Sequence, residues 1–224
     1  MSETWISGDP HFGHDKNSHG FGGIVHHAKR INPLTLKPFS CIEEHDEFIL
    51  DSWNKTVSPK DTLIVAGDHS WRNHNRYIGA IKCKQILVRG SHDNMSQDCL
   101  RNFTAVYQGM WVTTIHKVQF VISHCAFLVW EGSHYNAINC YAHSHQRLEE
   151  QDDIRSMDVG VDGSPNYVPW NVDFIIYKMS LKKKREYTKT EAELDAIVKK
   201  NKDNNTILLT QWKEQQLAKP LQPI

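Results

Sequence analysis

The chain has 224 residues with 26 basic and 26 acidic side chains, so its formal net charge is zero. Hydrophobic residues make up 39% and charged residues 23%, a balance that excludes a disordered chain. No apolar run approaches the roughly 18 residues of a membrane-spanning helix, and the lack of a basic excess argues against a long nucleic-acid footprint. The length suits one domain with a substantial core.

The five cysteines are scattered and never form a C-x-x-C pair. They predict neither a disulfide framework nor a zinc ribbon, and they favour a reducing compartment. The opening residues, Met1 to Trp5, lack the basic and apolar regions of a signal peptide, so we expect a cytoplasmic protein. Histidine is the unusual residue, because there are 14 copies and imidazole is the commonest metal ligand among side chains.

The first half of the chain alternates predicted strands and helices. Residues 9–38 form a long polar stretch that we interpret as a functional loop. Ser40-Cys-Ile-Glu43 matches a capping box, which predicts the start of an amphipathic helix that ends before Pro59. The other elements expected here are strands at 4–8, 62–67 and 84–89, and helices at 71–81 and from Ser96 onward.

The second half is expected to contain mainly strands. We predict a hairpin of 111–115 with 118–123, followed by strands at 139–142, 157–161 and 172–177. The basic run from Lys182 to Arg185 then marks a change of composition, and helices are expected from Thr190 and over 207–217. Together these elements predict an α/β sandwich with a mixed sheet at 1–180 and a C-terminal helical extension at 181–224.

Several of the short apolar runs end in Asp or His. The run 62–67 reads as a buried strand that stops at a glycine and delivers Asp68. Because an open α/β sheet places its chemistry at such strand ends, we expect these side chains to gather around Asp68. The other runs deliver Asp9 and His11, His92 and Asp93, His124, and the pair His143 and His145.

A cluster of Asp and His favours a transition metal over calcium, which prefers oxygen ligands alone. The ligands are sufficient for two ions, and two ions roughly 3.5–4 Å apart need a bridging carboxylate, for which Asp68 is the candidate. Each histidine taken alone could equally be a strand cap or a solvated side chain. The prediction of a metal site therefore depends on their convergence.

The order of these motifs resembles the calcineurin-like metallophosphoesterases, whose pattern is D-x-H, G-D, G-N-H-[DE], H and G-H-x-H. The matching segments are Asp9-Pro-His11, Gly67-Asp68, Gly90-Ser-His-Asp93, His124 and Ala142-His-Ser-His145. Further segments resemble the small bacterial and phage branch of that family: Ile6 to His14, Pro38-Phe39, Ser52-Trp-Asn54, and Val159-Gly-Val-Asp162 followed by Pro169. The resemblance extends over about residues 4–178 and leaves the C-terminal residues outside it.

This resemblance implies a calcineurin-like fold and a phosphoesterase in which a hydroxide bridging two divalent ions attacks the substrate. Mn²⁺ is the first expectation, and Ni²⁺, Fe and Zn²⁺ are chemically suitable. Transferred by position, the ligands are Asp9, His11 and His145 for the first ion, His124, His143 and Ser91 for the second, and Asp68 for both. His92 would stabilise the transition state or protonate the leaving oxygen, and Asp93 would orient His92.

The sequence departs from the family pattern at two positions. Ser91 replaces the Asn whose amide oxygen ligates the second ion, so we expect that site to be looser and the enzyme weakened. Ala142 replaces the Gly before the histidine pair, which is a milder change.

We assign His14 and Arg89 to substrate contacts, and His69 to packing or substrate contact rather than ligation.

The predicted substrate is a small phosphomonoester or phosphodiester of nucleotide-like chemistry. Long nucleic acid is not favoured, although a nuclease is kept as an alternative. The second alternative is a non-catalytic member of the fold that acts as a binding module, and the third is an enzyme that holds a single ion. The sequence leaves open the natural substrate, the oligomeric state and the role of residues 181–224.

Overall fold

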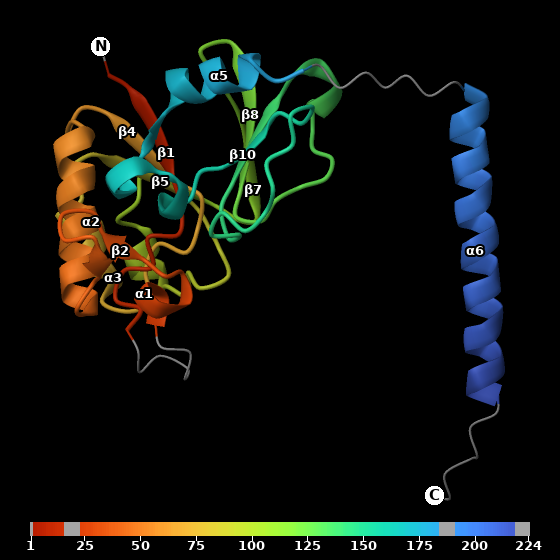
Figure 1. Cartoon of the computed structure of the whole chain (residues 1–224), viewed down its shortest axis with the longest axis horizontal. Helices are drawn as coiled ribbons and strands as arrows, with labels where there is room; N and C mark the ends of the chain where they lie inside the picture. The colour runs from red at the N-terminus through yellow and green to blue at the C-terminus, as the bar shows by residue number, and fades with distance from the viewer. Residues whose placement is uncertain (1, 16–22, 184–190, 218–224) are drawn as a thin grey trace, which may run out of the picture. The chain divides into compact units, whose positions relative to one another are not determined.

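The computed structural model describes residues 2–15, 23–183 and 191–217. The chain divides into two compact units, Met1–Lys184 and Arg185–Ile224 (Figure 1). All of the strands that the structure describes belong to the first unit. The second unit contains one long helix, α6 (Glu191–Leu217). The assignment of residues 1–180 to a metallophosphoesterase domain stays a prediction.

The first sheet has five strands in the order β11-β1-β4-β5-β6. Four of them run parallel, and the edge strand β11 is antiparallel to β1. In the register of this sheet, Ile6 of β1 lies beside Ile64 of β4, which in turn lies beside Ile86 of β5. The strands are β1 (Thr4–Ser7), β4 (Thr62–Val65), β5 (Lys84–Val88), β6 (Ala105–Tyr107) and β11 (Trp170–Asn171).

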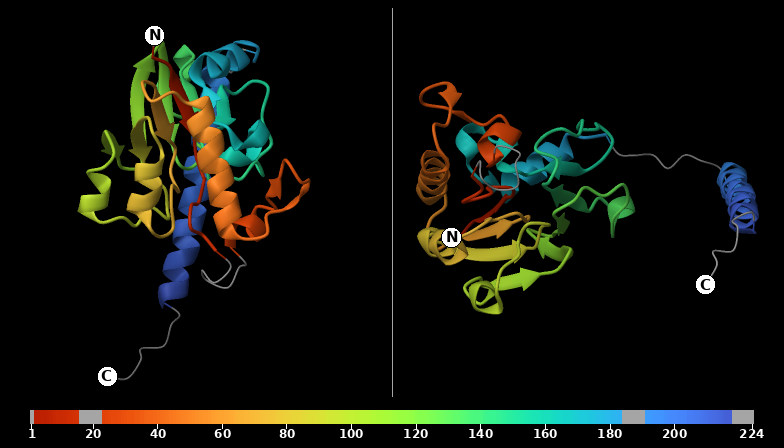
Figure 2. Two further views of the ribbon diagram at one scale, coloured as in Figure 1. Left: turned by 90° about the vertical axis from the view of Figure 1, so that its left-hand side faces the viewer. Right: turned by 90° about the horizontal axis from the view of Figure 1, so that it is seen from below.

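The second sheet has the order β10-β9-β8-β7. Strands β7 and β8 form the expected antiparallel hairpin, whereas β8, β9 and β10 run parallel to one another. These strands are β7 (Met110–Ile115), β8 (Val118–Ser123), β9 (Ile138–Tyr141) and β10 (Ser156–Asp158). Both main sheets are therefore mixed, as predicted, and Figure 2 shows them from two further sides.

The core lies on both faces of the first sheet. Because successive strand residues point to opposite faces, Leu63 and Val65 pack toward the helices while Ile64 packs toward the second sheet. The helix side includes Trp53 of α2, which is fully buried. The covering helices are α2 (Ile42–Thr56), α3 (His74–Ala80) and the short α4 (Gln97–Leu100). This arrangement confirms the predicted α/β sandwich.

The segment 172–177 is a helix, so the prediction of a strand there was wrong. Helix α5 (Val172–Ser180) begins where the Asn171 side chain accepts a hydrogen bond from the backbone N–H of Asp173. Its buried residues are Val172, Ile175 and Met179, and their spacing follows one helical face. The apolar and β-branched run in the sequence concealed this helical period.

The long loop and the C-terminal helices also differ from expectation. Residues 23–38 contain α1 (Gly23–His27) and a small hairpin of β2 (Ile31–Asn32) with β3 (Lys37–Pro38). Near the C-terminus one continuous 27-residue helix, α6, replaces the two that we expected, while Thr190 lies outside the described residues. The sequence pattern also missed the short strand β6.

Ser40 contributes to the start of α2 in a different way from the predicted capping box. Its backbone N–H and its hydroxyl both donate to the carboxylate of Glu44, and Cys41 occupies the N-cap position.

Three short 3-10 helices complete the described elements: η1 (Ser133–Tyr135), η2 (Val161–Gly163) and η3 (Pro165–Tyr167). In the part of the chain that the structure describes, each helix is too short or too polar to cross a bilayer.

Candidate metal centre

The two sheets bring five chain segments together at their strand ends. Beyond β1 and β4 the chain continues in register, since Asp9 donates its backbone N–H to Gly67 at 3.0 Å and His11 donates to Asp68 at 3.0 Å. In the second sheet Ala142 donates in the same way to the carbonyl of His124 at 2.9 Å. The parallel pairing therefore aligns the polar residues that follow each strand.

Glycines allow the segments to approach closely at this edge. A Cβ atom on Gly67, which has a φ of +85°, would lie 2.5 Å from Nδ1 of His124. A Cβ atom on Gly90 would lie 2.3 Å from Oδ1 of Asp68. The glycines of the G-D and G-S-H-D motifs are therefore needed to make room for the ligands themselves.

Most of the candidate ligands adopt left-handed backbone conformations, which non-glycine residues rarely do. The positive φ values are 53° for Asp9, 52° for His11, 52° for Asp68, 66° for His143 and 48° for His145. Each such residue costs of order 1 kcal/mol and is commonly found at active sites, because the surrounding structure must hold it in place. This concentration of unfavourable backbone conformations in one place indicates a functional site.

The first group of candidate ligands is Asp9, His11 and His145. One ligand atom from each lies within 4.8 Å of the others. Asp9 and His11 are buried, and the side chain of His145 is 10% exposed. These three residues correspond to the predicted ligands of the first ion.

The second group is Asp68, His124 and His143, whose ligand atoms also lie within 4.8 Å of one another. Nε2 of His124 is 3.2 Å from Oδ2 of Asp68 and 3.1 Å from Nδ1 of His143. The same Oδ2 atom lies 3.5 Å from Nε2 of His11 in the first group. Asp68 is therefore placed between the two groups, where a bridging carboxylate would be.

Buried polar atoms at the centre support the presence of an ion. Oδ1 of Asp9 and Nε2 of His11 are both buried and have no hydrogen-bond partner among the described residues. An unsatisfied buried donor or acceptor costs about 1–3 kcal/mol, and a divalent ion would satisfy both atoms. Imidazole and carboxylate ligands together suit Mn, Fe, Ni and Zn. The residues present therefore fit the two-ion site.

The ionisation of the ligands follows from burial and from their neighbours. Burial raises the pKa of Asp9 to about 7, against the lowering effect of His145 and His124. Burial lowers the pKa of His11 well below its usual value, so this imidazole stays neutral as a ligand must. Burial alone would lower the pKa of His124, but the hydrogen bond and charge of Asp68 raise it to about 9.

A buried arginine lies behind the first group, and sequence reasoning missed it. Arg30 forms a bidentate ion pair with Asp162, with Nε 2.7 Å from Oδ1 and Nη2 2.8 Å from Oδ2. It also donates to the backbone carbonyls of Asp9 and Pro10. Asp162 in turn lies 2.8 Å from Nδ1 of His145. Arg30 and Asp162 thus orient two of the three ligands in the first group.

Asp93 does not make the contact that we expected with His92. Its Oδ2 accepts the backbone N–H groups of Asp68 and Gly90 at 2.9 and 2.8 Å, and its Oδ1 accepts that of His69 at 2.8 Å. These contacts hold the loops after β4 and β5 against each other. Asp93 therefore supports the backbone around Asp68, and its predicted role in orienting the His92 ring is corrected accordingly.

Ser91 and His92 lie on the exposed side of the second group. The Ser91 hydroxyl donates to Oδ2 of Asp68 at 3.4 Å, and the backbone N–H of His92 donates to Oδ1 at 2.8 Å. Nε2 of His92 is 3.9 Å from Oδ2 of Asp68, and its side chain is 42% exposed. His92 is thus near the shared carboxylate and accessible to a substrate.

Trp71 connects the predicted substrate contact His14 to His92, a feature that sequence reasoning did not find. The Trp71 ring is stacked on His14 with centroids 4.1 Å apart and an angle of 7°, and its centroid is 4.6 Å from that of His92. Nδ1 of His14 lies 3.3 Å from Nδ1 of His11. The backbone N–H of Trp71 donates to the carbonyl of Phe12, which fixes Trp71 beside the first motif.

The other two predicted contact residues, Arg89 and His69, are held by contacts within the protein. Arg89 donates to the backbone carbonyl of Asp93 at 2.6 Å and contacts Gln108, so its guanidinium is engaged by the protein. His69 is fully buried, and its ring makes edge contacts with Phe12 and Phe103. Burial lowers the pKa of His69 to about 3, which agrees with a packing role for this side chain.

Comparison with known proteins identifies a sequence relative and a structural neighbour. No family model matches the chain. An uncharacterized protein of Methanocaldococcus jannaschii is 21% identical over 184 residues, which is 79% of this chain and 90% of the relative. A crystal structure of a protein of unknown function from Aquifex aeolicus has a TM-score of 0.57 at 17% identity, covering 80% of this chain and 100% of that one. This likeness shows the fold.

Two more distant structural neighbours are a Vps29 and a phosphoesterase. Vps29 of Chaetomium thermophilum has a TM-score of 0.40 at 16% identity, covering 74% of this chain and 76% of that one. Yfce, a phosphoesterase from E. coli, also has a TM-score of 0.40, at 13% identity, covering 71% of this chain and 78% of that one.

Proposed function

We propose that this protein is a calcineurin-like metallophosphoesterase that hydrolyses a small, nucleotide-like phosphodiester or phosphomonoester. It would use two divalent metal ions, for which Mn²⁺ is the first expectation. The observation that carries the proposal is the pair of adjacent ligand groups, with Oδ2 of Asp68 in the second group 3.5 Å from Nε2 of His11 in the first. The order of the motifs and the α/β sandwich support the same assignment. The five cysteines are unpaired in the structure, which supports a reducing compartment such as the cytoplasm.

In the proposed hydrolysis the metal ions and the protein side chains have different roles. When bound, the two ions would neutralise charge on the phosphoryl oxygens and lower the pKa of water. The oxygen of a water molecule forms a bond to phosphorus while the ester P–O bond breaks, and the water molecule releases one proton to the solvent. His92 donates a proton to the departing oxygen, because its ring is exposed beside Asp68. His14, held by Trp71, faces the substrate from the first motif.

Hydrolysis of bis-p-nitrophenyl phosphate and p-nitrophenyl phosphate with Mn²⁺ tests this proposal. We expect release of p-nitrophenolate that a chelator abolishes and that added Mn²⁺ restores. The ratio of diester to monoester rates then narrows the substrate class. Asp68→Asn is the matched inactive control, since it removes the shared carboxylate charge while it preserves the shape of the side chain.

The alternative functions predict different results in the same assay. The assay is run on the wild-type protein and on Ser91→Asn. If Ser91→Asn is active and the wild-type protein is not, the chain is a phosphoesterase that is disabled at its second ion site. If neither of these two proteins is active with Mn²⁺, Ni²⁺ or Zn²⁺, the proposed hydrolysis is contradicted and a binding module is favoured. Cleavage of single-stranded DNA at a rate above that of the small diester would instead indicate a nuclease.

A further inference from the structure

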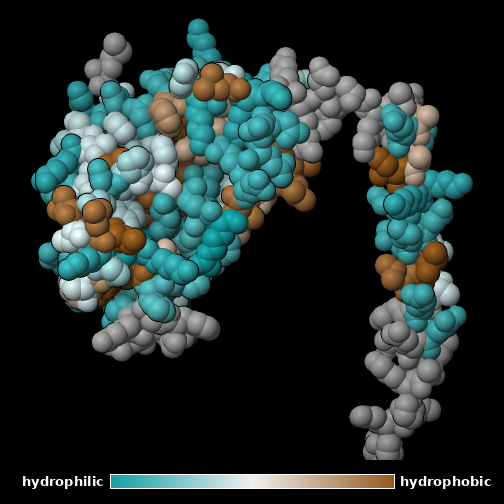
Figure 3. All heavy atoms as spheres, viewed as in Figure 1, coloured by the Kyte–Doolittle hydropathy of each residue, from teal (hydrophilic) through white to brown (hydrophobic). Residues whose placement is uncertain are grey.

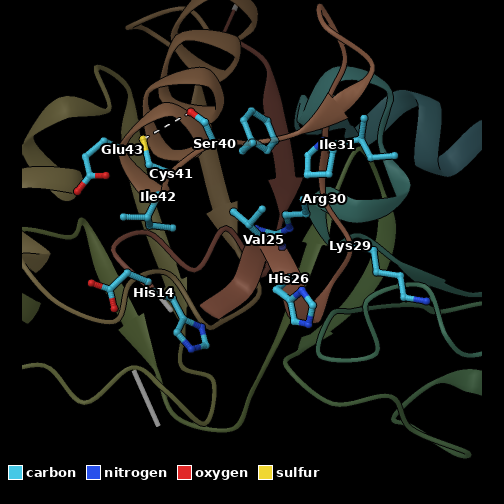
Figure 4. Close-up of a pocket in the computed structure, with 13 residues that line it drawn as sticks. His14, Val25, His26, Lys29, Arg30, Ile31, Ser40, Cys41, Ile42 and Glu43 are labelled. Atoms are coloured by element: carbon cyan, nitrogen blue, oxygen red, sulfur yellow. Dashed lines mark hydrogen bonds between the residues drawn. The ribbon is translucent and has the colours of Figure 1, made fainter. Parts of the chain in front are cut away.

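A cavity of about 690 Å³ lies beside the candidate metal centre, between α1, the β2–β3 hairpin and the start of α2 (Figure 4). Its volume lies within the range of roughly 300–1,000 Å³ that is typical of small-molecule sites. A phosphoryl group alone would occupy only a small part of it. The cavity therefore has room for the organic group of a phosphate ester.

Two residues belong both to this cavity and to the surroundings of the first ligand group. His14 lines the cavity, and its Nδ1 lies 3.3 Å from Nδ1 of His11. Arg30 also lines the cavity, and its Nη2 donates to the backbone carbonyl of Asp9. A substrate whose phosphorus lies at the metal centre can therefore extend its organic group past His14 into the cavity.

The lining has an apolar wall and a polar rim. Val25 of α1 is drawn near the middle of Figure 4, with Ile42 of α2 on one side of it and Ile31 of the hairpin on the other. Lys29 and Glu43 are exposed at the rim and supply a hydrogen-bond donor and an acceptor. An apolar wall favours a ring, and the two polar groups favour a ring that has hydrogen-bonding edges.

The charges around the cavity argue against a polyanion. Arg30 is already paired with Asp162, and Arg72, which lies nearby, is paired with the lining residue Asp15 at 2.8 Å. The acidic side chains of Asp15 and Glu43 line the same cavity as Lys29. A nucleic-acid channel needs a continuous basic track, which the described lining does not supply.

We propose that this cavity binds the nucleoside of a nucleoside phosphodiester while the phosphoryl group lies at the metal centre. A nucleoside combines a planar ring with hydrogen-bond donors and acceptors and carries no charge of its own. The inference rests on the proposed hydrolysis, because it assigns the substrate class of that same site. Neither the motifs nor the ligand groups require such a cavity.

Two p-nitrophenyl diesters with the same leaving group and charge test the proposal on the Mn²⁺-loaded protein. One is the p-nitrophenyl ester of thymidine 5′-monophosphate, and the other is methyl p-nitrophenyl phosphate. We expect kcat/KM to favour the thymidine ester by about tenfold or more, the discrimination that a pocket of this kind supplies. A ratio near one would overturn the proposal.

Filling the cavity should lower that ratio. Ile42→Trp places a large side chain in the cavity, and we expect the preference for the thymidine ester to fall by about tenfold. Leu34→Trp is the matched control, because Leu34 lies in the turn of the β2–β3 hairpin, is 81% exposed and does not line the cavity. An equal ratio in both variants would contradict the proposal.

A second pair of variants covers the case in which Ile42→Trp does not fold. Glu43→Ala removes the acceptor at the rim and should lower kcat/KM for the thymidine ester by about threefold or more relative to the methyl ester, as expected for a lost hydrogen bond. Glu47→Ala, one turn further along α2 and also exposed, should leave the ratio unchanged. A ratio that is unaltered in Glu43→Ala counts against the nucleoside.

Failure of the proposed hydrolysis can be separated from failure of this inference. If the wild-type protein hydrolyses neither ester, calorimetry with thymidine 5′-monophosphate and with inorganic phosphate decides the case. Tighter binding of the nucleotide, weakened in Ile42→Trp and not in Leu34→Trp, would support the cavity although the enzyme proposal had failed. Equal binding of nucleotide and phosphate, or no binding, would overturn it.

Discussion

The two candidate ligand groups differ in how firmly the protein holds them. In the first group Asp9 and His11 are 0% and 4% exposed, and Arg30 and Asp162 lie directly behind them. In the second group His143 is exposed, and Ser91 contacts Asp68 only at 3.4 Å. The first group is therefore a pre-formed, buried site, whereas the second is open on the side where a substrate would approach.

This difference predicts that the two ions bind with different affinities. A buried site whose ligands are already oriented binds its ion without further ordering, so we expect the first ion to bind more tightly. The second ion would depend on the open side of the centre, where the predicted ligand Ser91 lies. Both carboxylates contact residues of the two groups, since Oδ2 of Asp68 lies 3.5 Å from Nε2 of His11 and Oδ2 of Asp9 accepts the backbone N–H of His143 at 2.6 Å. Removal of the Asp68 carboxylate should weaken the binding of both ions.

Asp68→Asn is expected to have the largest effect on activity. Loss of the shared carboxylate charge should reduce hydrolysis of bis-p-nitrophenyl phosphate by about 10³-fold or more, since both ions lose a ligand. Circular dichroism should show an unchanged fold. Retention of more than a tenth of the wild-type rate would show that Asp68 does not bridge the ions.

Arg30→Met tests the support of the first group. The substitution removes the guanidinium that pairs with the buried Asp162, and breaking a buried ion pair costs about 3–5 kcal/mol of unfolding free energy. Urea denaturation of the metal-free protein measures this loss. The matched control is Lys29→Met at the neighbouring exposed position, where we expect less than about 0.5 kcal/mol. Similar losses in both variants would contradict the assigned role of Arg30.

Trp71→Ala tests the positioning of His14 and His92. Loss of the stacked ring should lower kcat by about 10- to 100-fold with little change in KM, because small misplacements of catalytic groups are costly. Trp71→Phe preserves an aromatic surface and should recover most of the rate. Mn²⁺ affinity should be unchanged in both variants. A loss of Mn²⁺ binding instead would show that Trp71 only supports the fold.

The pH dependence of metal binding should separate the two groups. An ion must displace the protons of its ligands, so affinity rises with pH until those groups are deprotonated. The pKa of Asp9 is raised to about 7, so affinity at the first group should level off above that pH. The pKa of His124 is raised to about 9, so affinity at the second group should keep rising by up to about tenfold per pH unit. Parallel curves for the two ions would contradict this assignment.

Ser91→Asn is expected to have the smallest effect and to make the two groups more alike. An amide oxygen at this position should tighten the binding of the second ion by about fivefold, less than the roughly 10- to 100-fold seen for changes around metal ligands. The first ion should be unaffected. If neither affinity changes in calorimetry, Ser91 does not limit the second site.

The side chains that cluster at the strand ends could be recognised in the sequence because their signals are local. An apolar run that stops at Asp or His, as at Asp68 and His124, can be recognised without knowledge of the rest of the fold. The parallel register then brings such ends together, which follows from general rules of sheet structure. The assignment of roles to each ligand stays a prediction.

The supporting residues could not be predicted, because their contacts are long-range. Arg30 lies in what the sequence presented as a polar loop, yet it pairs with Asp162, 132 positions later. Trp71 follows a predicted strand end with no pattern that links it to His14. Helix α5 was missed for a different reason, since its apolar residues are also strand formers and only the Asn171 cap distinguishes it.

The C-terminal helix illustrates another limit of sequence reasoning. Helix α6 was expected as two pieces, but its 27 residues are continuous. Figure 3 shows hydrophobic and hydrophilic patches along it, and the exposed apolar residues are Ile197, Val198, Ile207, Leu208 and Leu209. Nothing in the described residues assigns a partner to these side chains.

Calorimetric titration of the metal-free protein with Mn²⁺ tests the central claim most directly. The account predicts two ions per chain that bind in two steps, with the tighter step lost in His11→Ala and the weaker step lost in His143→Ala. A single step with one ion, or loss of the same step in both variants, would contradict two distinct sites that share Asp68.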